Sequence, residues 1–196
     1  QGLALLFQLP VNSPPLQGPQ RGKARRHGQG IPREGAGLVD LPLGRHVPHD
    51  LFLSSVSADG QPASEPTTVW VAFDRDNIYI AARLFDSEPA RITGRLGRRD
   101  ETTESDLFDV GLDPYHDRRS GYYFGINPSG SIEDGTLAND EEADATWDGV
   151  WESAARIDGL GWAVEIRIPF DQLRFKRRDV NLWGINFQRL VKRKNE

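Results

Sequence analysis

Short runs in which apolar and polar residues alternate, separated by turn residues, constrain the fold of this chain most strongly. The run over residues 67–73 places three apolar side chains on one face: Val69, Val71 and Phe73. Trp70 lies on the other face of the same run. Residues 74–77 have the composition of a tight turn, and residues 77–85 resume the strand pattern. A period of two residues predicts strands with one buried face, joined here as a hairpin.

Six further segments have strand character, whereas the three-and-four spacing of a long amphipathic helix does not occur. These segments are residues 91–96, 106–113, 120–127, 151–157, 161–169 and 181–191. Residues 170–173 are expected to form a single helical turn. Strands with one apolar face each bury that face when two sheets pack together. The sequence therefore predicts an all-β fold, a two-sheet antiparallel β-sandwich or jelly roll, with Trp162 and Trp183 in its core.

The first fifty residues differ in composition from the rest of the chain. They hold 7 of the 13 prolines, 8 of the 20 glycines and a single aromatic residue, Phe7. A segment so poor in large apolar groups cannot offset its ordering entropy by burial. We therefore expect residues 1–59 to form an irregular, poorly structured tail, and residues 60–196 to form the folded domain.

Charge and residue usage exclude several classes of function. Residues 51–196 carry 18 basic and 26 acidic side chains, a balance that argues against nucleic acid as the main partner. The chain has no cysteine, which excludes disulfides and thiolate metal sites. It has no methionine either, and His116 is the single histidine beyond residue 50, so haem lacks its usual axial ligands. Neither nucleic acid nor haem is expected as a partner.

One acidic segment has the composition of a cation site. Residues 131–155 carry eight acidic side chains and no lysine or arginine. Carboxylates crowded without counter-charges suit a hard cation, and calcium is the natural choice. The expected ligands are Asp140, Glu142 and Asp144. The spacing does not match an EF-hand loop, so a solvated acidic loop without metal is the alternative.

An ordered series of short motifs gives the chain a resemblance to a known family. The series comprises residues 98–100, 105–106, 111–113, 117–124, 127–130, 147–152, 161–165, 168–175, 183–187 and 193–196. In this order it resembles the amino-terminal domain of a family of bacterial outer-membrane β-barrel proteins. That domain is similar to family 9 carbohydrate-binding modules and is DOMON-like. The family's usual opening is not recognisable in residues 1–59, so a non-native origin of that segment stays open.

The resemblance implies a function, partners and a location. It implies a non-catalytic module that binds polysaccharide or oligosaccharide, in glycan capture or carbohydrate catabolism at the bacterial envelope, in the periplasm or outer membrane, or secreted. It implies structural calcium, and a C-terminal β-barrel region of the same parent protein, from which residues 60–196 are truncated. Two alternatives stay open. The domain could pack on the barrel as a plug without binding sugar, or belong to a glycoside hydrolase whose activity lies in a fused domain.

Three tryptophans are candidate sugar platforms. Family 9 modules hold a sugar between two tryptophan rings, and the resemblance implies Trp147 and Trp151, four residues apart, in this role. Trp147 lies outside the clear strands, which makes it the better candidate for an exposed ring. For Trp151 the alternative is a ring that caps the core. Trp70 faces away from the apolar side of its strand and is a further candidate.

Four polar side chains are candidate partners for sugar hydroxyls: Arg98, Arg99, Asp100 and Asn127. Guanidinium groups donate forked hydrogen bonds, which makes Arg98 and Arg99 suitable, and the amide of Asn127 both donates and accepts. For the arginines the alternative is salt bridging to a neighbouring acid, of which three are near in sequence: Asp100, Glu101 and Asp106. The sequence predicts no catalytic residue.

Overall fold

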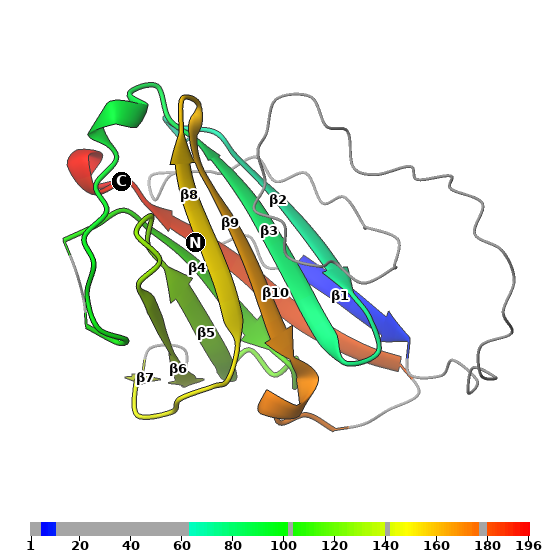
Figure 1. The fold of residues 1–196 in the computed structure, drawn as a ribbon. Helices are drawn as coiled ribbons and strands as arrows, with labels where there is room; N and C mark the ends of the chain where they lie inside the picture. Colours follow the sequence, from blue (N-terminus) through cyan, green and yellow to red (C-terminus); the bar gives the residue numbers. More distant parts are fainter. Residues whose placement is uncertain (1–4, 11–62, 102–103, 140–141, 177–179) are drawn as a thin grey trace, which may run out of the picture.

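The two-layer all-β sandwich predicted from the alternation is confirmed. The computed structural model describes residues 5–10, 63–101, 104–139, 142–176 and 180–196. Within these ranges, ten strands form two antiparallel sheets that pack face to face (Figure 1). Among the same residues, no helix has the length and apolar character needed to cross a membrane.

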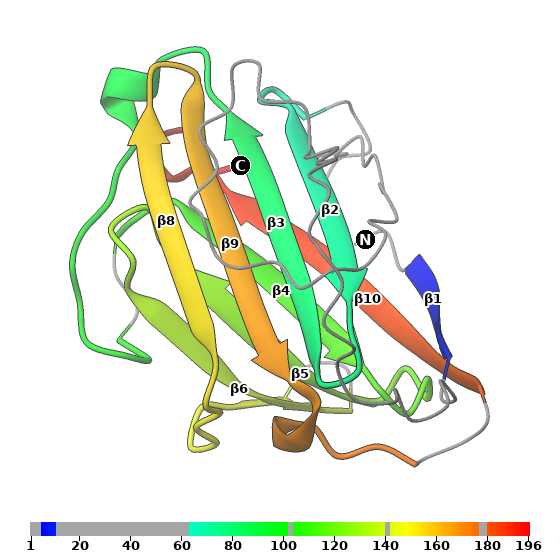
Figure 2. The same cartoon turned by 45° about the vertical axis from the view of Figure 1, so that its right-hand side comes forward.

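The smaller sheet has four strands in the order β2-β3-β9-β8 and lies in front in Figure 2. Its strands are β2 (Thr67–Phe73), β3 (Asn77–Phe85), β8 (Glu152–Asp158) and β9 (Gly161–Pro169). The predicted hairpin joins β2 to β3. Asp74 Oδ1 closes it by accepting the backbone N–H groups of Asp76 and Asn77, each at 2.8 Å. This side-chain-to-backbone bonding is the reason that aspartate favours turns.

The larger sheet has six strands in the order β1-β10-β4-β5-β6-β7. Its strands are β1 (Leu5–Pro10), β4 (Leu107–Asp113), β5 (Ser120–Ile126), β6 (Ile132–Ala138), β7 (Glu142–Asp144) and β10 (Val180–Leu190). The helical turn expected after β9 is present as a 3-10 turn over Phe170–Gln172. Two further 3-10 turns cover Pro89–Arg91 and Lys192–Lys194.

The strand expected over residues 91–96 does not form, and this prediction is wrong. The chain leaves the 3-10 turn Pro89–Arg91 and crosses from the four-stranded to the six-stranded sheet without joining either. Three side chains hydrogen-bond the backbone of this crossing segment: Ser105, Asn127 and Ser131. Because these side chains satisfy backbone groups of the segment, it does not need a neighbouring strand as a partner.

Three strands lie where the sequence did not predict them. Strands β6 and β7 lie within the acidic segment, and β6 pairs with β5 along its full length. Strand β1 pairs with the edge of β10, within the segment expected to be irregular. The remainder of residues 1–59 lies outside the described residues, so the division of the chain near residue 60 stays a prediction.

The core lies between the two sheets. Trp162 and Trp183 are both fully buried, as predicted. Three alternating side chains of β4 are buried with them: Phe108, Val110 and Leu112. A large apolar side chain contributes about 1.5–3 kcal/mol to stability when it is fully buried. These inward faces fix which side chains of each strand point to the outside.

Ion pairs join the segment that follows β10 to the segment that precedes β2. The Arg193 guanidinium donates to both carboxylate oxygens of Asp86, at 2.6 and 2.9 Å, and to Glu65 at 3.0 Å. Lys194 adds a bond of 2.5 Å to Glu65. Both acids are buried. The segment after β10 is therefore tied to the residues that precede β2.

Candidate functional site

Most of the sequence-predicted contact residues lie in two loops on the side of the sandwich where β7 and β8 form the sheet margins (Figure 1). These two loops meet there. One precedes β4 and carries Arg98, Arg99 and Asp100, and the other connects β7 to β8 and carries Trp147 and Trp151. Arg98, Arg99, Trp147 and Trp151 were separate candidates in the sequence, and the hydrogen bond from Arg99 to Gly149 brings their two loops into contact.

A network centred on Arg99 joins the two loops. Arg99 Nε donates to Asp134 Oδ1 at 2.7 Å, and Arg99 Nη2 donates to the carbonyl of Gly149 at 2.7 Å. Asp134 Oδ2 accepts the Gly149 N–H at 2.7 Å, and Asp100 Oδ1 accepts the Asp134 N–H at 2.9 Å. Asp148 lies 3.2 Å from Arg99 Nε. We call these five residues the Arg99 junction.

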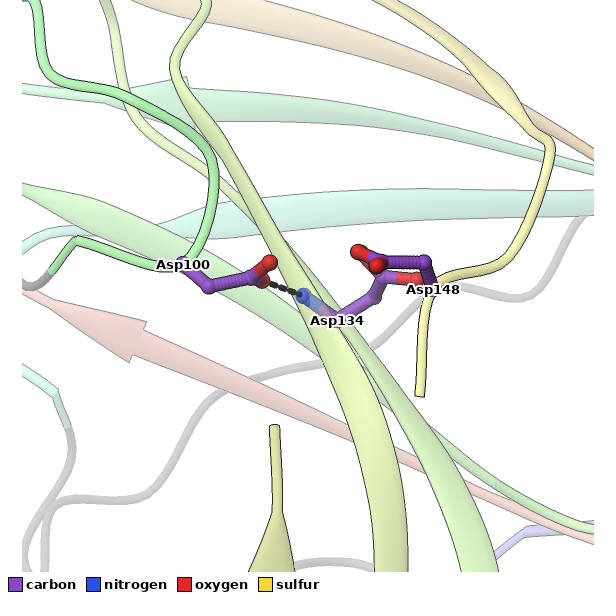
Figure 3. Close-up of side chains that lie close together, drawn as sticks. All are labelled: Asp100, Asp134 and Asp148. Carbon is purple, nitrogen blue, oxygen red and sulfur yellow. Dashed lines mark hydrogen bonds between the residues drawn. The ribbon is translucent and has the colours of Figure 1, made fainter. Parts of the chain in front are cut away.

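Three carboxylates of the Arg99 junction lie close together. Asp100, Asp134 and Asp148 each offer one oxygen, and these oxygens lie within 4.8 Å of one another. Figure 3 shows Asp100 and Asp148 approaching Asp134 from two different loops. Asp134 is fully buried, whereas 67% of the Asp148 side chain is exposed. The geometry alone resembles a small site for a cation.

The N–H groups around Asp134 occupy the oxygens that a metal ion would need. Its two oxygens already accept hydrogen bonds from Arg99 and from the Gly149 N–H. The Arg99 guanidinium also lies against the other two carboxylates of the group. A calcium ion needs six to eight free oxygen ligands, so it would have to displace the arginine. The junction therefore has the chemistry of an ion-paired structural network.

The metal ligands expected from the sequence do not belong to this group. Glu142 and Asp144 are exposed on β7, and Asp140 lies outside the described residues. Asp144 accepts hydrogen bonds from the Thr146 hydroxyl and N–H, and these bonds lower the pKa of Asp144. The calcium site over Asp140, Glu142 and Asp144 stays a prediction.

Trp147 lies against the aromatic core and remains half-buried. Its ring centroid is 4.9 Å from that of Tyr122 and 6.0 Å from that of Phe124, which it meets edge to face. A Cβ atom at Gly149 would lie 2.6 Å from Trp147 Cη2, so no larger residue fits there without a shift of the ring. The indole is thus fixed in place between the core and the Arg99 junction.

Trp151 and Asn127 have structural surroundings. Trp151 is 8% exposed and packs edge to face on Phe124. Its ring caps the core, which is the alternative that the sequence left open for it. Asn127 is 2% exposed. Its Oδ1 accepts the N–H groups of Ser129 and Ser131, and its Nδ2 donates to the Arg95 carbonyl. These bonds hold the turn after β5 against the crossing segment, and they leave little of either side chain for a ligand.

The two remaining candidates lie in different places. Arg98 is exposed in the loop that carries Arg99, and its backbone is hydrogen-bonded to Glu101. Trp70 is half-buried on the outward face of β2, opposite Ala81 of β3. Strand β2 lies at the margin of its sheet opposite to β8, so Trp70 and Trp147 cannot form a two-ring site.

Sequence reasoning missed the two residues that organise this side of the sandwich. Asp134 belongs to the acidic segment of the sequence, but it lies on β6 and pairs with Arg99, 35 residues away in the chain. Gly149 was noted only as part of a motif. The short Trp-Asp-Gly sequence was the available signal, since a glycine next to a fixed aromatic ring often marks a close approach.

Comparisons with known proteins identify the fold. No family model matches the chain, and no curated protein matches it. A solved structure of a protein from Bacteroides uniformis, proposed to bind carbohydrate, is similar with a TM-score of 0.54 at 17% identity. It covers 74% of this chain and 70% of that one. A family 9 carbohydrate-binding module from Caldicellulosiruptor kristjanssonii, in complex with cellotriose, has a TM-score of 0.46 at 14% identity, and 71% of each chain is covered.

Proposed function

We propose that the sandwich is a carbohydrate-binding domain and that its ligand lies over Trp147. The observation that carries the proposal is an indole ring that is fixed, half-buried and next to charged side chains that reach solvent. The fold shared with the Bacteroides uniformis protein, which is proposed to bind carbohydrate, supports it, as does the resemblance to family 9 modules.

The chemistry of the surroundings suits a sugar. The C–H face of a pyranose ring packs on an aromatic face, and its hydroxyl groups pair with planar charged groups. The Asp148 carboxylate accepts hydrogen bonds from hydroxyls, and the exposed Arg98 guanidinium donates to them. Arg99 is a positioning residue in this account, because it holds Asp148 and the Gly149 carbonyl in place.

The Arg99 junction lowers the cost of binding. A side chain that is already immobilised loses less rotamer entropy when a ligand arrives. The bonds from Arg99 and Asp134 to Gly149 fix the loop on which Trp147 and Asp148 lie. The proposal assigns no proton transfer to these acids, since both oxygens of Asp134 are taken by N–H donors, and it treats the domain as a binding module.

The wider role that we propose is glycan capture at the bacterial envelope, as part of a longer protein with a β-barrel region. It is supported by the ordered motifs that resemble that outer-membrane family. Fractionation of cells that produce the parent protein tests the location. Recovery in the membrane or periplasmic fraction is expected, and recovery in the cytoplasm contradicts it.

Calorimetry with the 196-residue chain and a panel of neutral oligosaccharides tests the binding function. We expect at least one glycan to bind, and Trp147→Ala to weaken it at least about tenfold, or about 1.4 kcal/mol. Arg98→Ala, at an exposed position, should weaken it without a change in melting temperature. Trp70→Ala, on β2 at the margin opposite to β8, is the matched control and should bind normally.

Two results contradict the proposal. Binding that is unchanged in both Trp147→Ala and Arg98→Ala would place the ligand elsewhere. Failure of every glycan to bind a folded chain would favour a plug-like domain that packs on its own barrel.

A further inference from the structure

Strand β8 has one open edge. In the part of the chain that the structure describes, β8 pairs with β9 on one side and ends the four-stranded sheet on the other (Figure 2). An edge strand presents unpaired backbone N–H and C=O groups, which can pair with a strand of another chain. Proteins often block such an edge with proline, lysine or a bulge. Strand β8 contains neither proline nor lysine, and its seven residues pair with β9 without a bulge.

The side chains of β8 show that this edge is accessible. Glu152, Arg156 and Ile157 are all exposed. Ile157 is opposite the buried Trp162 of β9, so its side chain points to the core side of the sheet. Even so, 43% of Ile157 is exposed, which places the exposed part at the open edge. A strand added at this edge would remove that apolar surface from water.

The charges of β8 are self-complementary. When two copies of β8 pair antiparallel about a two-fold axis at Ala154, Glu152 of each copy lies opposite Arg156 of the other. Opposite charges in this position stabilise a strand pair, and like charges destabilise it. A shift of the axis by one residue, to Ala155, would place Glu152 opposite Asp158 of the other copy. The sequence of the strand therefore favours one register with a copy of itself.

The same register covers the exposed isoleucine. Ile157 of one copy lies opposite Trp151 of the other, directly before the start of β8. Both side chains belong to the core side of the sheet, where the Trp151 ring caps the core. The pairing thus adds an apolar contact on one face of the joined strands and two ion pairs on the other face.

We propose that β8 is an interface to a second copy of this chain, in which the two four-stranded sheets join antiparallel through their β8 strands. The contact is isologous, because the same edge serves both copies. Glu152 Oε1 accepts a hydrogen bond from Arg167 within its own sheet, and Oε2 accepts from Arg156 of the second copy. Backbone hydrogen bonds join the strands, and the charge pairs select their register.

The interface also links two copies of the proposed Trp147 site. The loop that carries Trp147 leads directly into β8, so the two loops lie at opposite ends of the paired strands. Val150 of one copy lies opposite Asp158 of the other, which separates the two loops by about 25 Å at about 3.3 Å per residue. Two linked sites bind one polymeric glycan with avidity. This consequence rests on the proposed function, whereas the interface itself does not.

Sedimentation velocity measurements on the 196-residue chain test the interface. We expect the mass to rise with concentration from that of one chain, 21.9 kDa, toward twice that value. Arg156→Glu places acids opposite each other at both ends of the interface and should keep the chain monomeric. Glu152→Arg places basic groups there and should do the same. Arg75→Glu, an equal charge change at an exposed position of the β2–β3 turn, is the matched control and should dimerise normally.

A mixture of the two monomeric variants tests the register. An Arg156→Glu chain that meets a Glu152→Arg chain has opposite charges at both positions, so a mixed dimer should form. Melting temperatures of the separate variants check that each is folded.

Three outcomes overturn the interface: a wild-type chain that is monomeric at every concentration, a dimer that persists in Arg156→Glu, or folded variants that do not associate when mixed. The proposed function is judged separately, because a neutral glycan binds at Trp147 with or without the dimer. A dimer that binds no glycan would contradict the proposed function and leave the interface in place.

Discussion

At the scale of single residues, two glycines allow charged and aromatic side chains to approach one another closely. Gly149 allows Trp147 to lie against the Arg99 junction, and Gly125 opens the space into which Asp109 and Glu133 lean. In both places a missing side chain brings charged or aromatic groups together from segments that are distant in sequence. The chemistry of each surface therefore depends on a residue that contributes no functional group.

The raised pKa of Asp109 predicts that stability falls as the pH rises from about 4 to about 8. Burial, and then the charge of Glu133, raise the pKa of Asp109 to about 8. An unfolded aspartate has a pKa near 4, so between about pH 4 and pH 8 the folded state holds a proton that the unfolded state has released. This contribution is complete below the unfolded pKa and disappears as the pH rises through about 8. Asp109→Asn should flatten the decline in melting temperature between pH 5 and pH 9. Parallel pH profiles of the two proteins would contradict this.

At the scale of secondary-structure elements, alternation predicted the strands with one apolar face and failed elsewhere. Strand β6 was missed because Asp134 points inward, where hydrogen bonds from Arg99 and from the Gly149 N–H, in two different loops, make its burial tolerable. The segment 91–96 has strand-like residues, but side chains satisfy its backbone. Sequence spacing contains neither kind of information, since both depend on partners about ten to thirty-five residues away.

The sequence predicted the residues of the candidate site only in part, as it did the strands. Trp147 was the better of the two tryptophan candidates because it lies outside the strands, and the structure leaves it half-buried while Trp151 is in the core. The pairing of Arg99 with a neighbouring acid was weighed as an alternative, but its main partner, Asp134, is remote. The alternation over residues 107–113 puts Asp109 on the face opposite to Phe108 and Val110, yet its convergence with Glu133 depends on strand register across β5.

The Arg99 junction predicts that β6 and the loop before β8 lose stability together. Asp134→Asn removes the negative charge that partners Arg99, and a third of the Arg99 side chain is exposed, which reduces the penalty. We expect a loss of about 2 kcal/mol in the free energy of unfolding, measured by urea denaturation. Asp148→Asn, at a mostly exposed side chain, is the matched control and should cost less than about 1 kcal/mol. Equal costs would show that the junction does not fix the loop.

At the scale of the whole molecule, two sheets with six and four described strands enclose one aromatic core and leave two surfaces where charged and aromatic groups meet. The side with the margins β7 and β8 carries the proposed Trp147 site, and the outward face of the larger sheet carries Asp109 and Glu133. The ion pairs of Arg193 with Asp86 and Glu65 join the ends of the sandwich without contributing to either surface. The Arg99 junction thus contributes both to stability and to the proposed Trp147 site, whereas the ion pairs of Arg193 contribute to stability alone.

The most direct test of the central claim is a nitrogen-correlated NMR titration of the 196-residue chain with the neutral oligosaccharide that binds best in calorimetry. We predict that the largest chemical-shift changes occur at the Trp147 indole N–H and at the backbone amides of Asp148, Gly149 and Val150. Changes centred on Trp70 and the four-stranded sheet, or no changes at saturating ligand, would contradict a carbohydrate site at Trp147.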